Sequence, residues 1–362
     1  MSTNAVDAIG AVAAVDLGST SGSVMLGHVG PNELRLSELA RFSNTPVQIW
    51  DGDRAGLHWS VVELYKNMVG GLAAAVAAEP ELASIGVDAW AADYGLVRRG
   101  RALGMPFHHR DERTGVGVAI THSLVDRAAL YQENGLQFLP FNTLYQLTMD
   151  RIDGILAEAE LAVLIPDFFT YWLSGERVTE VTNASTTGLL NHNGAWNLQL
   201  MERLAFPRRL FSPLVLPGTE VGRLLPSVLP KGVTSSAMVT TVGAHEGASA
   251  VVAVPMHSES AAYISCGTWG LVGVELDRPV LTEAARLANF SNERGVDGHI
   301  RFFRNVVGLW LLSECARTWH AQGVRADLPT LLARAEMLAA PQAMFDVNDP
   351  RFMPTGDMPR RI

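Results

Sequence analysis

The sequence has few cysteines and few basic residues. Its two cysteines, Cys266 and Cys315, lie far apart in a chain of 362 residues. We therefore expect neither a disulfide framework nor a structural zinc site, and a reducing, cytoplasmic location fits. Lysine and arginine number 28 against 37 acidic residues, a formal net charge of -9. Because a nucleic-acid-binding protein needs a basic face, this balance argues against a nucleic-acid partner.

Signals for export and for membrane insertion are also missing. The opening residues, "MSTNAVDAIGAVAAVDLGST", have no basic start before their apolar stretch, which argues against a signal peptide. The alanine-rich run "GGLAAAVAAEP" is too short and too polar at its flanks to cross a bilayer. Hydrophobic residues make up 48% and charged residues 18%, as in globular proteins. The composition predicts a soluble, cytoplasmic protein with no membrane partner, long enough for two domains.

One plan of strand, tight turn and strand occurs twice in the chain. Residues 11–30, "AVAAVDLGSTSGSVMLGHVG", contain two apolar runs separated by a small polar turn. Residues 261–276, "AAYISCGTWGLVGVEL", repeat the plan. One copy in each half predicts two related α/β domains, residues 10–254 and 255–362, that meet near Val254–Pro255.

Three stretches have the pattern of helices. Residues 59–79 have helical spacing, and Ser60 with Glu63 three residues on predicts a capping box at the start. The aromatic run "IPDFFTYWLSGE" predicts a helix that ends at Gly175. Residues 305–323, "NVVGLWLLSECARTWHAQG", carry apolar residues at positions 306, 309, 310 and 316, which predicts one continuous helix.

Each of the two hairpin turns is a candidate phosphate loop. In "DLGSTSG", from Asp16 to Gly22, glycine and hydroxyl residues let backbone N–H groups turn toward an anion, and Asp16 can hold Mg²⁺. An ordinary hairpin turn favours the same residues, so the motif alone leaves both interpretations open. It lacks the Lys-Ser/Thr ending of a Walker loop. The second turn, "SCGTWG", offers similar donors, and the two loops together would clamp the terminal phosphates of a nucleotide across a cleft.

Two further stretches place polar groups beside buried strands. "DAWAADYGL", from Asp88 to Leu96, has two carboxylates and two aromatic rings just beyond the predicted strand "LASIGVDAW". This is the chemistry of a sugar pocket, and equally that of a capped loop with core aromatics. His245 and Glu246 interrupt the apolar run "VGAHEGASAVVA". Glu246 can accept a proton from a substrate hydroxyl, or it can simply be an acid at a helix N-terminus.

In this order, these stretches resemble the FGGY family of carbohydrate kinases, and within it the members that phosphorylate L-rhamnulose. The similarity covers "AAVDLGSTSGSVML", "SIGVDAWAADYGLV" and "YISCGTWGLVG", and its most specific part is "GLQFLPFNTLYQL". It implies an actin-like, ribonuclease H-like fold of two α/β domains around a cleft. It also implies transfer of the γ-phosphate of ATP to the 1-hydroxyl of L-rhamnulose in rhamnose catabolism, with ATP and Mg²⁺ as cofactors.

The resemblance assigns roles to residues of both predicted domains. It implies contacts to the ATP phosphates by Ser19, Thr20, Ser21, Gly22, Ser23, Gly267 and Thr268, and contacts to the sugar by Ala91, His245, Glu246, Gly247 and Asn305. Glu246 stands at the position of the family's general base, and Asp16 at the position that serves Mg²⁺.

The sequence departs from the family pattern at the site itself. The base is an aspartate in the family, followed by threonine, where this chain has Glu246 and Gly247. One extra side-chain carbon moves the carboxylate by about 1 Å, a displacement that can cost about a hundredfold in rate. The family's arginine at the end of the first phosphate loop is replaced by Ser23, and Ser313 stands where a glutamine contacts ATP.

The chain also ends at Ile362, where the family continues through the rest of the second domain. We therefore expect an incomplete second domain, or a separately encoded remainder as partner. Three alternatives stay open: a catalytically impaired sugar-binding remnant, a kinase for another ketose such as L-fuculose or L-xylulose, and an actin-like ATPase without a sugar.

Overall fold

The computed structural model describes residues 10–256, 258, 261–267, 269–324, 327–340, 344–347, 349–352 and 356–362. The chain forms two compact units. The first unit takes in Met1–Pro255 and Glu275–Phe302, and the second takes in Met256–Val274 and Phe303–Ile362. The predicted division of domains near Val254–Pro255 stays a prediction.

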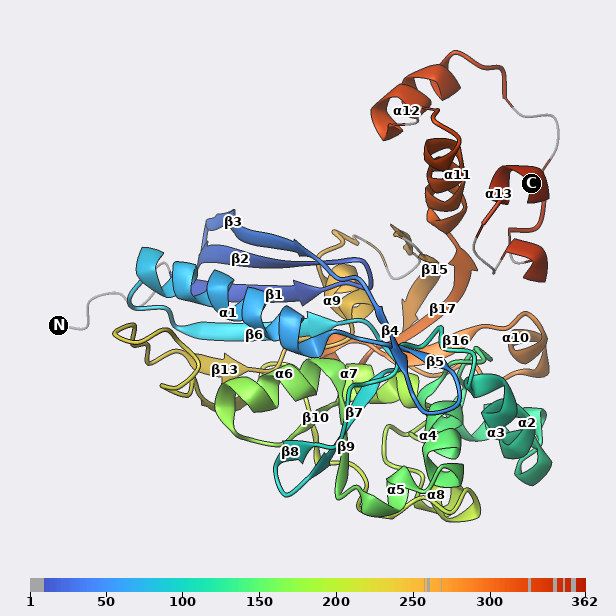
Figure 1. Ribbon diagram of the computed structural model, residues 1–362, viewed down its shortest axis with the longest axis horizontal. Helices are drawn as coiled ribbons and strands as arrows, with labels where there is room; N and C mark the ends of the chain where they lie inside the picture. The colour runs from blue at the N-terminus through green and yellow to red at the C-terminus, as the bar shows by residue number, and fades with distance from the viewer. Residues whose placement is uncertain are drawn as a thin grey trace. The chain divides into compact units, whose positions relative to one another are not determined.

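A six-stranded mixed sheet lies at the centre of the first unit (Figure 1). Its strands, in spatial order, are β12 (Glu220–Arg223), β13 (Met238–Thr240), β6 (Ser84–Ala89), β1 (Gly10–Leu17), β2 (Ser21–Gly30) and β3 (Glu33–Ser43). The strand β1 pairs antiparallel with β2 and parallel with β6. The hairpin predicted from residues 11–30 is therefore confirmed, and parallel pairing brings the carboxyl ends of β1 and β6 to one edge.

Helix α1 (Val61–Ala78) runs along this sheet (Figure 1). Its buried side chains, among them Leu64, Met68 and Leu72, belong to the same apolar core as strands β1, β2 and β6. By length and composition alone α1 would be apolar enough to cross a membrane, but its burial against the sheet identifies it as a core helix. Ser60 precedes α1 without a side-chain hydrogen bond, so the predicted capping box is wrong although the helix is confirmed.

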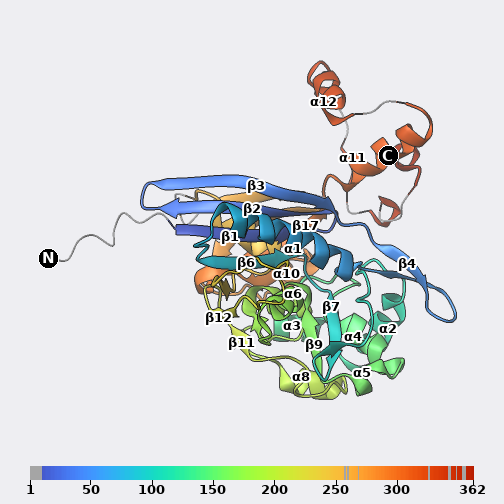
Figure 2. The same cartoon turned by 60° about the vertical axis from the view of Figure 1, so that its left-hand side comes forward.

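A mostly helical layer completes the first unit and has its own apolar core (Figure 2). It contains α2 (Thr114–Leu124), α3 (Arg127–Asn134), α4 (Thr143–Ile152), α5 (Ile155–Glu158), α8 (Leu198–Arg203) and the small sheet of β8 (Arg101–Ala102), β7 (Tyr94–Arg98) and β9 (Leu161–Leu164). Helix α6 (Ile165–Ser174) ends at Gly175, as the sequence predicted, and the φ of 80° at Gly175 makes it a left-handed cap.

The first unit also contains shorter elements. They are the pair β4 (Val47–Trp50) and β5 (Ala55–His58), the pair β10 (Thr179–Glu180) and β11 (Leu214–Val215), α7 (Val181–Ala184), α9 (Glu246–Val252), α10 (Glu283–Leu287) and the 3₁₀ turns Ser185–Thr187 and Val296–Gly298. Strand β16 (Ser291–Arg294) pairs with β17 (Ile300–Val307) at the edge of a four-stranded sheet.

The second unit is built on the second predicted hairpin. Strand β14 (Ala262–Cys266) pairs antiparallel with β15 (Trp269–Leu276), as expected. This unit also holds the end of β17 (Ile300–Val307), helices α11 (Trp310–Ala321), α12 (Leu328–Glu336) and α13 (Met358–Arg361), and the 3₁₀ turn Pro350–Phe352. Strands β15 and β17 each run from one unit into the other.

The continuous helix predicted over residues 305–323 is wrong at its start. Residues up to Val307 belong to β17, and the helix begins only at Trp310. The β-branched side chains of Val306 and Val307 suit a strand. Gly308 interrupts the pattern because a Cβ there would lie 2.6 Å from the backbone nitrogen of Gly270.

Candidate active site

Three carboxylates come together where β1, β6 and α9 meet. Asp16 and Asp88 are register partners on the parallel strands β1 and β6. Helix α9 starts at Glu246, and the Ala89 N–H at the end of β6 donates to the Ala244 carbonyl at 2.9 Å. A Cβ placed on Gly18 would lie 3.5 Å from Glu246 Oε2. The carboxylate of the candidate base therefore lies close to the first predicted phosphate loop, and Figure 1 shows α9 beside the ends of these strands.

Burial raises the pKa of all three carboxyl groups, and like charges add to the rise for Glu246 and Asp88. Burial, followed by the charge of Asp16, raises the pKa of Glu246 to about 7. Burial, followed by the charges of Asp16 and Glu246, holds the pKa of Asp88 well above its usual range. Burial also raises the pKa of Asp16. The cluster thus concentrates negative charge, and a proton or a cation relieves the repulsion.

Asp16 and Asp88 fit a magnesium ion that takes only one or two ligands from the protein and the others from phosphate and water. Asp88 Oδ1 is buried and has no hydrogen-bond partner, so it is an acceptor left open beside Asp16. Within the described part of the chain, no group of three His, Cys, Asp or Glu side chains is placed to hold a metal. Magnesium typically binds through one or two carboxylates, with phosphate oxygens and water completing its shell. Asp16 and Asp88 can supply that share.

The first phosphate loop is a tight turn held from a neighbouring strand. The Gly18 N–H donates to the Ser21 carbonyl at 2.9 Å. Asn44, which is buried, donates its side-chain amide to the Gly18 carbonyl at 2.8 Å and its backbone N–H to the Thr20 carbonyl at 3.0 Å. Ser19 and Thr20 thus form the turn, while Ser21 begins β2. No pattern in the sequence predicts the role of Asn44, because its contact depends on how β3 ends.

A cation stands near the loop although position 23 is not an arginine. Ser23 is buried in β2, and its register partner on β3 is Arg41. The Arg41 charge lowers the pKa of Asp16, opposing the effect of burial. Arg41 is itself exposed and donates to Glu38 through Nε at 2.8 Å. Cross-strand register, which the sequence alone does not fix, brings this charge to the loop.

His245 is held by a buried arginine and a buried glutamate. Arg301 Nη2 lies 2.8 Å from His245 Nδ1 and 2.8 Å from Glu293 Oε2, and His245 Nδ1 lies 3.2 Å from the same oxygen. An unprotonated Nδ1 accepts from Arg301, since a guanidinium nitrogen can only donate, whereas a protonated Nδ1 donates to Glu293. The shorter contact is the one with Arg301, which favours the tautomer with the ring proton on Nε2. Burial and then the Arg301 charge lower the pKa of His245, which keeps the ring neutral. Its Nε2–H is therefore suited to donate to a hydroxyl.

Gly247 leaves room for this arrangement. A Cβ at that position would lie 2.9 Å from Arg301 Nη1 and 3.4 Å from the His245 ring. The glycine therefore permits the close approach of the guanidinium to the histidine.

The backbone before Glu246 is anchored by a buried acid that the sequence did not reveal. Glu180 Oε2 accepts from the Ala244 N–H at 3.1 Å and from the Asn183 N–H at 3.1 Å. Thr182 Oγ1 accepts from the His245 N–H at 3.2 Å. Burial raises the pKa of Glu180 to about 6, although these donors oppose the rise. The segment "TNASTTG" thereby fixes the direction in which His245 and Glu246 leave the backbone.

The stretch "DAWAADYGL" divides into a substrate-facing candidate and a structural centre. Asp93 is fully buried and accepts from Trp59 Nε1 at 2.6 Å, Trp90 Nε1 at 3.0 Å and Gln146 Nε2 at 2.8 Å. Burial acts to raise the pKa of Asp93, but the charge and hydrogen bond of His109 outweigh it and the pKa is lowered. For Asp93 and its two tryptophans, the capped-loop interpretation is therefore the better one. Ala91, half-buried beside them, remains a predicted sugar contact.

The remaining predicted residues belong to the second unit. The Gly267 N–H donates to the Trp269 carbonyl at 2.9 Å, and the Gly267 carbonyl accepts from the Leu309 N–H at 2.9 Å, so two backbone hydrogen bonds hold Gly267. Asn305 lies in β17. Thr268 lies outside the described residues. The predicted clamp between the two phosphate loops stays a prediction.

Family models and curated relatives agree on the ancestry of the chain. The model of the FGGY carbohydrate kinase N-terminal domain matches residues 83–253, and that of the C-terminal domain matches residues 262–362. A rhamnulokinase of Pectobacterium atrosepticum is 42% identical over 358 residues, which are 97% of this chain and 69% of the relative. The chain belongs to the FGGY family of carbohydrate kinases. A rhamnulokinase of Bacillus subtilis is 36% identical over 353 residues, 96% of this FGGY chain and 71% of the relative.

Solved structures agree on the fold of this FGGY chain. A xylulose kinase from Lactobacillus acidophilus superposes with a TM-score of 0.75 at 17% identity, covering 91% of this chain and 66% of that one. The structure of Plasmodium falciparum glycerol kinase with ADP superposes with a TM-score of 0.71 at 13% identity. The match covers 91% of this chain and 67% of the glycerol kinase. The predicted actin-like fold of the sugar kinases is confirmed. The chain spans about two thirds of the length of these proteins.

Proposed function

We propose that this chain transfers the γ-phosphate of ATP to the 1-hydroxyl of L-rhamnulose, forming L-rhamnulose 1-phosphate in rhamnose catabolism in the cytoplasm. The observation that carries the proposal is the approach of the Glu246 carboxylate to the first phosphate loop, where Glu246 Oε2 lies 3.5 Å from the position that a Cβ on Gly18 would occupy, beside Asp16 and Asp88. A base, a phosphate loop and a cation site are the parts that phosphoryl transfer to a hydroxyl requires. Rhamnulokinases at 36% and 42% identity support this acceptor.

Each residue has a defined task in this proposal. Glu246 accepts the proton of the attacking hydroxyl, and the Nε2–H of His245 donates to a neighbouring hydroxyl of the sugar. The backbone at Ala91, with Gly247 and Asn305, completes the sugar contacts. The loop from Ser19 to Ser23 binds phosphate oxygens, and Gly267 and Thr268 do so from the second predicted loop. Asp16 and Asp88 would hold Mg²⁺, which neutralises phosphate charge when bound.

The test is ADP release by the purified chain with Mg-ATP and one of three ketoses: L-rhamnulose, L-fuculose or L-xylulose. We expect release that depends on L-rhamnulose and exceeds that with the other two sugars. Glu246→Gln should lower the rate by about 10² to 10⁴, the range that a general base contributes. Faster turnover of another ketose would contradict the proposed acceptor. Equal turnover by Glu246→Gln would contradict the proposed base.

A further inference from the structure

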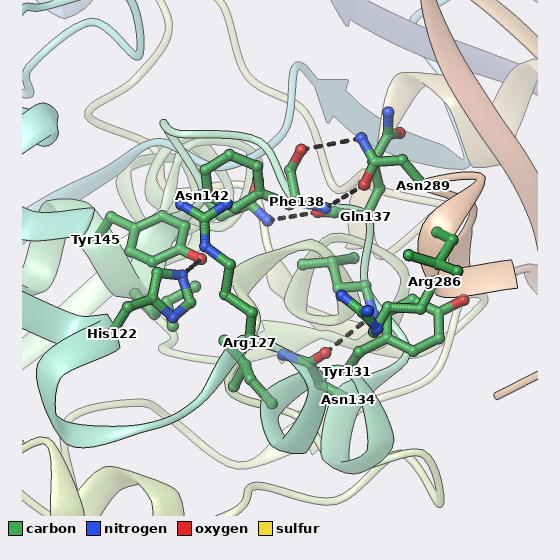
Figure 3. A pocket seen from close by; sticks show the side chains of 14 residues that line it. His122, Arg127, Tyr131, Asn134, Gln137, Phe138, Asn142, Tyr145, Arg286 and Asn289 are labelled. Carbon is green, nitrogen blue, oxygen red and sulfur yellow. Dashed lines mark hydrogen bonds between the residues drawn. The ribbon is translucent and has the colours of Figure 1, made fainter. Parts of the chain in front are cut away.

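A cavity of about 230 Å³ lies in the helical layer of the first unit (Figure 3). Residues from α2, α3, α4 and α10 line it, and none of them belongs to the candidate active site. Its lining includes the buried side chains of Leu130, Leu136 and Leu144. An apolar lining with several polar groups around it is the usual composition of a small-molecule site. The volume suits a compact ligand of about one ring.

The cavity is built by the motif that the proposed reaction does not use. Six lining residues come from "GLQFLPFNTLYQL": Leu136, Gln137, Phe138, Asn142, Leu144 and Tyr145. The motif is tied to the segment after α10, because the Gly135 carbonyl accepts from Asn292 Nδ2 at 2.9 Å and the Phe138 N–H donates to Asn289 Oδ1 at 2.9 Å. Gly135 has a φ of 66°, and a Cβ there would lie 2.7 Å from Leu281 Cδ2. The motif therefore forms one wall of the cavity, and hydrogen bonds to the segment after α10 hold that wall in place.

One arginine reaches across this cavity. The Arg127 side chain extends from α3, and its guanidinium carbon lies 4.2 Å from the centre of the Phe138 ring (Figure 3). Among the described residues, no carboxylate lies within ion-pair distance of Arg127. Stacking holds the planar donor fork in place before a ligand arrives, which lowers the entropic cost of binding a phosphate or carboxylate.

The other charged groups near the cavity are already engaged by groups of the protein. Arg286, which also lines it, donates to Glu283 through Nε at 2.7 Å. Asp126 accepts from the Ala128 N–H at 2.8 Å and caps α3. Burial, followed by the charge of Arg127, makes His122 a neutral ring with a lowered pKa. Arg127 is thus the cation left to meet a ligand charge.

Neutral polar groups surround that cation. His122 Nε2 lies 2.9 Å from the Tyr145 hydroxyl. Tyr131, whose pKa burial raises to about 12, keeps its hydroxyl proton. The amide side chains of Asn134 and Asn142 line the same space. Each of these groups already bonds within the protein, since Tyr131 donates to the Phe290 carbonyl at 3.1 Å and Asn134 Nδ2 donates to the Gly188 carbonyl at 3.0 Å. A hydroxyl oxygen has a second lone pair and an amide nitrogen a second N–H, and these match the hydroxyl groups of a sugar.

We propose that this cavity is a second ligand site, which binds a small sugar-like anion: Arg127 contacts a phosphate or carboxylate, and the surrounding hydroxyl and amide groups contact the hydroxyls of its body. The site is separate from the proposed kinase reaction and does not depend on it.

The experiment follows the His122 ring by NMR in the full chain without ATP, with the resonance assigned by its loss in His122→Gln. Glucose 6-phosphate tests a sugar that carries a phosphate, and gluconate tests one that carries a carboxylate. Inorganic phosphate supplies the negative charge alone, and glucose supplies the hydroxyls alone. We expect a saturable shift of the His122 resonance with at least one sugar anion, about tenfold tighter than with inorganic phosphate. Arg127→Gln should weaken that binding about tenfold, and the exposed Arg35→Gln should leave it unchanged.

Two results would overturn the inference. One is a sugar anion that binds Arg127→Gln as well as the wild type, or that leaves the His122 resonance in place. The other is glucose or inorganic phosphate binding as tightly as the sugar anions. Since binding is the readout, failure here leaves the proposed kinase reaction untouched, and an inactive chain can still bind.

Discussion

Glu246 combines a raised pKa with a place against the phosphate loop. Because its pKa is about 7, the carboxyl is largely protonated below that pH and cannot accept a proton from the substrate. We expect kcat/KM to rise with pH and to level off above about 8. In Glu246→Gln the remaining activity should lack this rise. The measurement is the pH profile of kcat/KM for both chains, and a wild-type rate that is flat between pH 6 and 8 would contradict the role of Glu246.

His245 depends on Arg301 for its tautomer. Since Arg301 donates to Nδ1, we expect ¹⁵N NMR of the free chain to show the proton of His245 on Nε2. Arg301→Met should move that proton to Nδ1, which then donates to Glu293, and should raise KM for the sugar about tenfold with a smaller change in kcat. The exposed Arg35→Met serves as control. A wild-type ring already protonated on Nδ1 would show that Glu293, not Arg301, orients the histidine.

At the scale of elements, helix α1 packs closely against strands β2 and β3 at Gly71. A Cβ on Gly71 would lie 2.6 Å from Val24 Cγ2 and 3.1 Å from Ala40 Cβ. We expect Gly71→Ala to lower the free energy of unfolding by about 1–3 kcal/mol, because the helix and the strand must separate. The matched change Gly70→Ala meets nothing within 4 Å. It should raise stability by about 0.5–1 kcal/mol through helix propensity, and urea denaturation compares the two.

The elements also separate what the sequence could predict from what it could not. Alternation of apolar residues predicted the hairpin of β1 and β2, and Gly175 predicted the end of α6. The start of α11 was misplaced because Val306 and Val307 suit a strand and a helix pattern alike, while the crowding at Gly308 is a tertiary contact. Likewise, local spacing predicted a capping box at Ser60 that the backbone does not form.

At the scale of the whole molecule, the sequence predicted the family. It also predicted the loop after β1 and the residues His245 and Glu246 where α9 begins, and these two segments form the candidate site. The carboxylate cluster follows from parallel pairing of β1 with β6. The sequence predicted both strands, but not that they pair with each other. The supporting residues Asn44, Arg41, Glu180 and Arg301 could not be predicted, since each reaches the site through register or a long-range hydrogen bond.

The central claim is that this chain joins a phosphoryl group to the 1-hydroxyl of L-rhamnulose with Glu246 as base. The most direct measurement is ³¹P NMR of the chain incubated with Mg-ATP and L-rhamnulose, with Glu246→Gln alongside. We predict a new phosphate monoester signal, coupled to the protons on C1 of the sugar, that grows with ADP and that the variant forms at least about a hundredfold more slowly. ATP that remains intact with a folded chain, or a phosphate ester at another carbon, would contradict the account.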